Sequence, residues 1–297
     1  MTYSIVARDP NTGDLGVAVQ SHWFAAGDVV MWAEPGVGAV ATQALAEAAH
    51  GALGLQLMRA GKSASEALAA RLAADDGRDH RQVAMVDATG QIAAHTGSSC
   101  LREAGHRAGA GFSTQANMMM NATVWDAMAG TYERAADEDL PHRLLDALDA
   151  AEAEGGDIRG KQAAGILVVK GSSSERPWED TIVHLRVDDH PDPFKELKRL
   201  LDMAQVNYAW NQGWTAFTQK RFPEALAAQE RAAALAPGNA EVLYDLACIR
   251  LAAGKRADAL EALGRALSAN PKLKAQAKVD ADLAPLRDAA EFEEMAK

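Results

Sequence analysis

The fold is decided close to the N-terminus, by the segment TYSIVARDPNTGDLGVAVQS at residues 2–21. Two short apolar runs, at residues 4–7 and 15–19, flank the stretch Asp9–Asp14, in which Asp, Pro, Asn and Gly gather. Apolar runs rich in Val favour strands, and clusters of those four residue types favour tight turns. The segment therefore predicts a β-hairpin that starts with the first residues of the chain.

Strands and helices then follow in blocks. Further strands are predicted at residues 36–42, 82–87, 91–97, 111–115, 163–169 and 182–187. Helices are predicted in pairs, at residues 44–60 and from the Ser63–Glu66 capping box through Leu72, then at 122–136 and 141–153. Adjacent hairpins with paired helices between them favour antiparallel sheets covered by helical layers, and not a parallel doubly wound sheet. We therefore expect an α+β domain.

The C-terminal third is internally repetitive. Residues 220–226, KRFPEAL, match residues 254–260, GKRADAL, at an offset of 34, and Pro237 matches Pro271 at the same offset. This period, with small residues where paired helices cross, predicts two tetratricopeptide repeats. A closing helix is expected from Leu273 to Lys297. The polar, proline-rich stretch before Pro193 is the expected boundary, which gives domains at residues 1–193 and 194–297.

Charge and composition exclude several classes of partner. The formal net charge is −11, and residues 193–297 carry 15 basic and 14 acidic residues, so the acidic excess lies in the first domain. An acidic surface repels phosphate backbones, so a nucleic-acid partner is not expected. No basic leader, no long apolar run and only two cysteines are present, which predicts a cytoplasmic protein without a membrane partner.

Residue Thr2 suggests a chemistry. Removal of the initiator methionine would leave a free α-amine next to a threonine hydroxyl at the start of a strand. An α-amine titrates near pH ~7.7–8.0 and is a suitable base for activating a hydroxyl nucleophile. The alternative is that a small second residue reflects methionine processing alone. Ser4 faces the same side of the strand as Thr2 by the two-residue period, so it is the reserve nucleophile.

Several stretches of the first domain resemble the domain-of-unknown-function 1028 family, which belongs to the N-terminal-nucleophile (Ntn) hydrolase-like superfamily. They are residues 3–10, 13–21, 36–43, 81–82, 86–87, 96–97, 155–162 and 185–190. The resemblance implies a four-layer αββα sandwich, in agreement with the order of elements. It also implies attack by the hydroxyl of the first residue on an amide carbonyl, which forms an acyl-enzyme. The resemblance supplies no substrate.

The resemblance distributes roles over nine residues. Thr2 is the implied nucleophile, with Asn117, Asp157 and Arg159 as the other candidate catalytic residues. The candidate substrate-binding residues are Gln20, Ser21, His22, Gln43 and Lys161. The pattern departs from that of a threonine protease, because no lysine stands near residues 36–38 and Gln20 replaces a carboxylate. A small amide or peptide-like substrate is therefore expected.

Each candidate has a structural alternative. Asn117 is also placed to cap the helix that follows it, and Asp157 with Arg159 is also placed to form a structural ion pair. His22 is compatible with a partly buried structural role as well as with a contact to a ligand. His95, Cys100 and His106 match no standard zinc spacing, so neither a metal nor a cofactor is expected.

Two functional hypotheses follow. The first is an Ntn-type amidohydrolase whose repeats assist assembly or bind a protein partner. The second is a non-catalytic module with a relict site in the sandwich and a peptide-binding groove in the repeats. A homo-oligomer is expected in either case.

Overall fold

A computed structural model of the chain describes residues 2–297, so Met1 and the expectation that it is removed lie outside the described residues. The chain divides into two compact units, Met1–Leu201 and Asp202–Lys297. The boundary between the units falls inside helix α6 (Pro193–Thr218). Phe194, Leu197 and Leu201 of this helix belong to the core of the first unit, and its residues from Asp202 onward belong to the second. Each unit is described by itself.

The first unit is built on two antiparallel sheets. The first sheet has the order β10-β9-β2-β1-β8-β7 and the second the order β3-β4-β5-β6. The strands of the first sheet are β1 (Thr2–Arg8), β2 (Leu15–Ser21), β7 (Gly105–Gly109), β8 (Phe112–Asn117), β9 (Ala163–Val169) and β10 (Thr181–Val187). Those of the second are β3 (Met31–Glu34), β4 (Gly38–Ala44), β5 (Arg81–Asp87) and β6 (Ile92–Thr96). The predicted N-terminal hairpin is β1–β2, and it forms the centre of the larger sheet.

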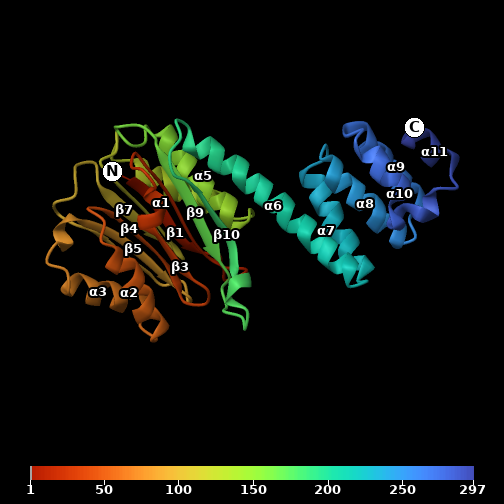
Figure 1. Ribbon diagram of the computed structural model, residues 1–297. Coiled ribbons are helices and arrows are strands. Elements are labelled where there is room, and N and C mark those ends of the chain that lie inside the picture. The colour runs from red at the N-terminus through yellow and green to blue at the C-terminus, as the bar shows by residue number, and fades with distance from the viewer. Residues whose placement is uncertain (1) are drawn as a thin grey trace. The chain divides into compact units, whose positions relative to one another are not determined.

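Helices cover the outer face of each sheet, so the unit has four layers in the order αββα, as predicted (Figure 1). The helices on the first sheet are α4 (Val124–Arg134) and α5 (Leu140–Ala153), and those on the second are α2 (Ala48–Arg59) and α3 (Ala64–Ala73). The capping box predicted at Ser63 and Glu66 opens α3, with each side chain bonding to the other residue's backbone N–H.

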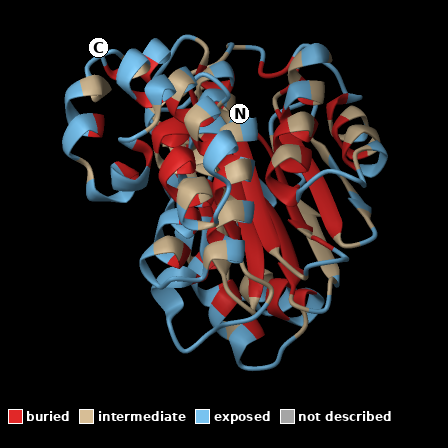
Figure 2. Cartoon of the chain, turned by 90° about the vertical axis from the view of Figure 1, so that its right-hand side faces the viewer, coloured by how far each residue is buried: buried red, intermediate tan, exposed pale blue. Residues whose placement is uncertain are grey.

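Alternation along β1 explains how one strand serves two cores. Tyr3, Ile5 and Ala7 point into the core under α4 and α5, whereas Val6 points into the core between the sheets. The buried residues accordingly concentrate in the strands and on the inward sides of the helices (Figure 2). Since Thr2 and Ser4 share the parity of Val6, both lie between the sheets.

The predicted elements do not include helix α1 (Ala26–Val30), edge strand β3, edge strand β7 or the 3₁₀ helices Arg78–His80 and Pro177–Glu179. Strand β7, GHRAG, has neither β-branched residues nor an apolar face, and its residues are partly or fully exposed. Its conformation is imposed by pairing with β8, which is buried along its whole length. Tertiary pairing outweighs local propensity there.

The second unit repeats in the predicted register. The remaining helices are α7 (Phe222–Leu235), α8 (Ala240–Ala252), α9 (Arg256–Ala269), α10 (Leu273–Val279) and α11 (Ala290–Ala296), with a 3₁₀ turn at Ala281–Leu286. Helices α7 and α9 begin 34 residues apart, and α8 and α9 share one apolar core. The single closing helix predicted at 273–297 is wrong. Asp280 instead caps a new 3₁₀ turn that contains Pro285, and so divides the segment into three pieces.

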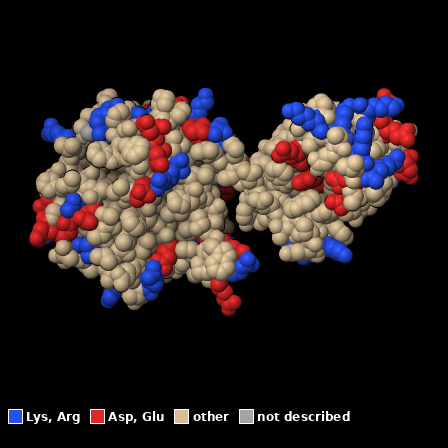
Figure 3. All heavy atoms as spheres, viewed as in Figure 1, with Lys and Arg blue, Asp and Glu red and all other residues tan. Residues whose placement is uncertain are grey.

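None of the helices in residues 2–297 combines the length and apolar composition required to cross a membrane. On the faces in view, acidic and basic side chains are interspersed over each unit (Figure 3).

Candidate functional site

Thr2 occupies the end of the central strand β1, between two neighbours that both carry candidate residues. It pairs with Ser21 of β2 on one side and with Asn117 of β8 on the other. The Thr2 hydroxyl lies 3.0 Å from the Ser21 hydroxyl, and Thr2 retains 6% of its surface exposed. The structure therefore brings three of the predicted site residues together, between the two sheets.

Two side-chain amides hold the backbone of Thr2, one from the opposite sheet and one from the neighbouring strand β8. The Thr2 carbonyl oxygen accepts hydrogen bonds from Gln43 Nε2 at 3.3 Å and from Asn117 Nδ2 at 3.4 Å. The same two amides also donate to Gln82 Oε1, at 2.8 and 3.0 Å. Asn117 does not cap a helix, because α4 begins at Val124 without a side-chain cap. Its alternative interpretation as a cap is wrong.

The amide network continues inward through Ser4. Gln115 Nε2 donates to Ser4 Oγ at 2.6 Å, and Ser4 Oγ donates to Gln43 Oε1 at 2.7 Å. Ser4 shares the face of Thr2, as predicted, but it is fully buried and its hydroxyl is engaged on both sides. This arrangement gives Ser4 a structural role rather than that of a nucleophile.

The sequence interpretation missed Gln82 and Gln115 as members of this network. Gln82 is fully buried and its Nε2 lies within hydrogen-bond distance of Thr96 Oγ1 and of the backbone oxygens of Gly105 and Ala116. The available signal was a glutamine directly before the four apolar residues 83–86 of a predicted strand. A buried amide needs several partners, and those partners come from other strands that a single segment does not reveal.

Gln20 lies on the opposite face of the sheet from Thr2, because it pairs with Tyr3 and shares the orientation of that residue. It is fully buried, and neither its Oε1 nor its Nε2 has a hydrogen-bond partner within residues 2–297. The structure thus does not join Gln20 to the Thr2 hydroxyl.

The loop before β9 is anchored by Asp157. Its carboxylate accepts hydrogen bonds from the backbone N–H of His22 at 3.2 Å and of Arg159 at 2.9 Å, and forms an ion pair with the Arg159 guanidinium at 3.1 Å. Asp157 is 4% exposed, whereas the Arg159 side chain is 28% exposed. The predicted structural ion pair is therefore present, and it ties the loop to the residue after Ser21. Gly155 and Gly160 of this loop adopt positive φ angles that favour glycine.

Lys161 belongs to a separate cluster on the helical side of the sheet. Its ammonium lies 3.7 Å from Glu152 and 3.3 Å from Asp192. Glu152 also accepts a short hydrogen bond from the Tyr3 hydroxyl. Burial, together with the negative charge of Glu152, holds the pKa of Tyr3 well above its ordinary value. Since successive side chains of a strand point to opposite faces of the sheet, Tyr3 and this cluster face away from the Thr2 hydroxyl.

The three residues considered for zinc contact other groups. His95 Nε2 lies 2.9 Å from the Arg78 carbonyl oxygen, His106 Nδ1 lies 2.9 Å from Thr96 Oγ1, and Cys100 Sγ donates to the Arg81 carbonyl oxygen. Within residues 2–297, no group of three His, Cys, Asp or Glu side chains is placed to hold a metal ion.

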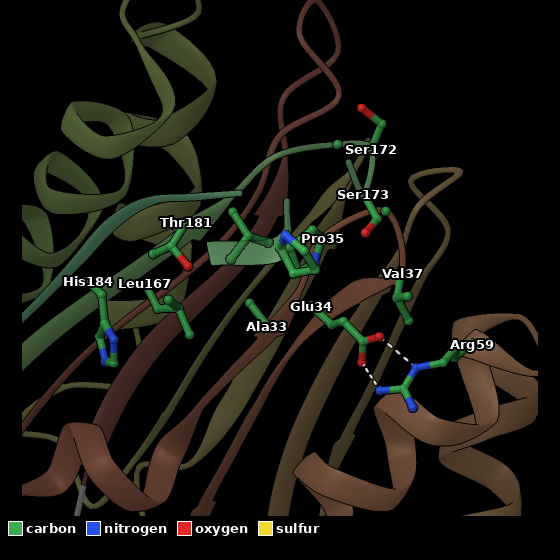
Figure 4. A pocket seen from close by; sticks show the side chains of 14 residues that line it. Ala33, Glu34, Pro35, Val37, Arg59, Leu167, Ser172, Ser173, Thr181 and His184 are labelled. Carbon is green, nitrogen blue, oxygen red and sulfur yellow. Dashed lines mark hydrogen bonds and ion pairs between the residues drawn. The ribbon is translucent and has the colours of Figure 1, made fainter. Parts of the chain in front are cut away.

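A groove of about 830 Å³ lies at the other end of the sandwich (Figure 4). Ala33, Leu167 and Val169 line it, and Glu34 and Arg59 form an ion pair at its rim. Strand register places it far from Thr2, because Val169 pairs with Leu15 whereas Ala163 pairs with Ser21. The groove is thus separate from the residues predicted for the site.

Together these observations define an αββα sandwich with a hydroxyl pair at one end of its central hairpin and a buried amide network behind it. Residues 2–197 match the family described as a family of unknown function, DUF1028, and residues 216–281 match a tetratricopeptide repeat family. The chain belongs to the DUF1028 family. It is similar to protein SPO2555 from Silicibacter pomeroyi, a DUF1028 crystal structure, with a TM-score of 0.61 and 32% identity over 69% of this chain and 89% of that one. No curated protein matched the chain.

Proposed function

We propose that the first unit is an N-terminal-nucleophile hydrolase that cleaves the C–N bond of a small amide or peptide-like substrate through an acyl-enzyme on Thr2. The observation that carries the proposal is the position of the Thr2 hydroxyl. Thr2 is the first residue of the central strand β1, and its hydroxyl lies 3.0 Å from that of Ser21. The side-chain amides of Gln43 and Asn117 hold the Thr2 backbone in place through its carbonyl oxygen. A nucleophile held in one geometry by rigid strands is favourable for catalysis.

The reaction needs a free α-amine on Thr2, and hence cleavage of the peptide bond before it. The amine takes the proton from Oγ1 as the oxygen attacks the amide carbonyl carbon. The C–N bond then breaks, the proton passes to the departing amine, and an ester remains on Thr2. Water hydrolyses that ester to a carboxylic acid and restores the hydroxyl. Ser21 lies close enough to orient Thr2 Oγ1 during both steps.

Three measurements test this proposal. Intact-mass analysis of the native chain should show loss of Met1, and incubation with a panel of amides should show a covalent adduct on Thr2. Thr2→Ala should abolish turnover while the chain stays folded, whereas Thr2→Ser should retain it. A chain that keeps Met1 throughout, or a Thr2→Ala variant that still turns over substrate, would refute the proposal.

The groove at the far end favours a second candidate, a non-catalytic binding module. It offers apolar side chains with His184 and Ser173 among its polar ones, and Thr2 is not part of it. Small-molecule sites are commonly such mixed clefts. Ligand binding that is undiminished by Thr2→Ala but lost on Leu167→Asp would support this function.

The tetratricopeptide repeats suggest protein interaction. Within the second unit, α6 and α7 enclose a groove of about 420 Å³ lined by Tyr208, Asn211 and Arg221, among others. Tyr208 is 58% exposed there. We propose that a protein partner binds through the repeats. We also propose that the chain assembles into a homo-oligomer in the cytoplasm, and light scattering of the full chain tests its oligomeric state.

A further inference from the structure

The loops at the Thr2 end of the sandwich form one hydrogen-bonded belt. The Met119 N–H donates to the Glu103 carbonyl oxygen, and the Met120 N–H to that of Gly156. Asp157 then accepts from the backbone of His22. These bonds join the loop after β6, the segment after β8, the loop before β9 and the segment after β2, which are separate in sequence.

Arg81 continues the belt on the side of the second sheet. Its carbonyl oxygen accepts from Cys100 Sγ at 3.4 Å, and its Nη1 donates to the Leu45 carbonyl oxygen at 2.7 Å. Leu45 follows β4 two residues after Gln43, whose amide reaches Thr2. Five loops therefore surround the end of β1 at which Thr2 lies.

Each of these five loops exposes a large apolar side chain. We name as the apolar rim the six residues that the loops carry: Trp23, Phe24, Leu45, Leu101, Met120 and Ile158. Their exposed fractions lie between 47% for Ile158 and 65% for Trp23. Single exposed apolar residues are common, but a group gathered around one site is typical of ligand grooves and interfaces.

We infer that the apolar rim binds a large apolar group of the substrate, so that the substrate class is an amide with an acyl chain or aromatic ring next to the scissile bond. This inference rests on the proposed function of Thr2. A second copy of the chain seated on the rim would cover the same end and close the approach to Thr2. A ligand that carries its own apolar group instead brings the amide to the hydroxyl as it covers the rim.

The test uses the full chain with Thr2→Ala, which binds without forming an acyl-enzyme. Its probes are glycinamides that carry an acetyl, butanoyl, hexanoyl or octanoyl group, measured by calorimetry. We expect affinity to rise about four-fold for each methylene that reaches the rim. Trp23→Ser in the same background should weaken octanoyl-glycinamide binding about ten-fold. The matched control is Trp178→Ser, because Trp178 is 74% exposed but lies in the 3₁₀ helix Pro177–Glu179 beside the far groove.

The outcomes separate this inference from the proposal on which it rests. Affinity independent of acyl length, or an equal loss on Trp23→Ser and Trp178→Ser, would overturn the inference. So would a dimer that dissociates on Trp23→Ser without any dependence of binding on acyl length. If binding follows acyl length while the processed wild type hydrolyses none of the probes, the ligand class stands and the proposed hydrolysis fails. If the wild type hydrolyses all four equally well, the hydrolysis stands and the rim has no part in selecting the substrate.

Discussion

Two buried glutamines of the first unit should respond in opposite ways to the same substitution. Gln82 and Gln20 are both fully buried in strands. Gln82 bonds to five groups, two on neighbouring strands of its own sheet and three on the opposite sheet, whereas the amide of Gln20 bonds to none within residues 2–297. Methionine has a similar volume and no amide, so Gln→Met at each position isolates the contribution of the hydrogen bonds.

The size of the effect follows from the two shortest of the Gln82 bonds, both of 2.8 Å, to the Ala116 carbonyl oxygen and from Gln43 Nε2. A buried polar group that loses its partner costs about 1–3 kcal/mol. Gln43 Nε2 keeps the carbonyl oxygens of Thr2 and Gln115 as acceptors, so we expect Gln82→Met to lower the free energy of unfolding by about 3 kcal/mol in total. Gln20→Met removes an amide that is already unpaired, and should be neutral or stabilising by about 1 kcal/mol.

The assay must report on the first unit alone, because a chain of two units need not unfold in one step. Hydrogen–deuterium exchange of the β1 and β8 amides under native conditions gives the opening free energy of the sheet that holds Thr2. Exchange should accelerate in Gln82→Met and remain unchanged or slow down in Gln20→Met. Equal acceleration in both variants would show that the amide network does not stabilise the sandwich.

Two further predictions concern an ion pair and two helical glycines of the first unit. A hydrogen bond from Arg81 is the main cause that holds the pKa of Asp75 well below its ordinary value, so the pair stabilises the fold above about pH 4 and less as the pH falls. Asp75→Asn should therefore lower the free energy of unfolding by about 2 kcal/mol at pH 7, and urea titrations of both proteins should converge in acid; a constant difference from pH 7 to pH 2 would contradict this. Gly51→Ala should lower the melting temperature, at a cost of about 2 kcal/mol, because its Cβ would lie 2.3 Å from the Trp32 ring. Gly130→Ala, whose Cβ would meet only the end of a flexible arginine, should gain about 0.5–1 kcal/mol of helix propensity, and the opposite order in calorimetric scans would refute the steric argument.

The parts of the fold that the sequence predicted are those with a local signal. The hairpin at residues 2–21 has its turn residues between two apolar runs, and the capping box at Ser63 satisfies backbone groups within four residues. The 34-residue period likewise needs only a comparison of the chain with itself. Each signal lies within one element or one repeat, so no knowledge of distant contacts was required.

The amide network and the apolar rim lacked such a signal because each is assembled from separate strands or loops. Gln43, Gln82 and Gln115 belong to three strands in two sheets, and each alone resembles a polar residue at a strand end. The face of Gln20 was predictable, since antiparallel pairing of Thr2 with Ser21 places Gln20 beside Tyr3. The prediction for Gln20 treated its position next to Ser21 in the sequence as a position on the same face of the sheet as Thr2.

The bonds of Asn117 bear on how an oxyanion would be stabilised at this site. Its Nδ2 carries two hydrogens and already faces two acceptors, Gln82 Oε1 and the Thr2 carbonyl oxygen. Donating to a developing negative charge would require Asn117 to give up one of them. Its present geometry instead fixes the backbone of Thr2, the proposed nucleophile, which is a positioning role. Thr2 Oγ1 lies 3.0 Å from the hydroxyl of Ser21, the last residue of β2. In the proposed reaction, electrostatic stabilisation near Thr2 would therefore come from the Ser21 side of the site or from the belt of loops around it, and not from the amide network, whose donors already bond within and between the two sheets.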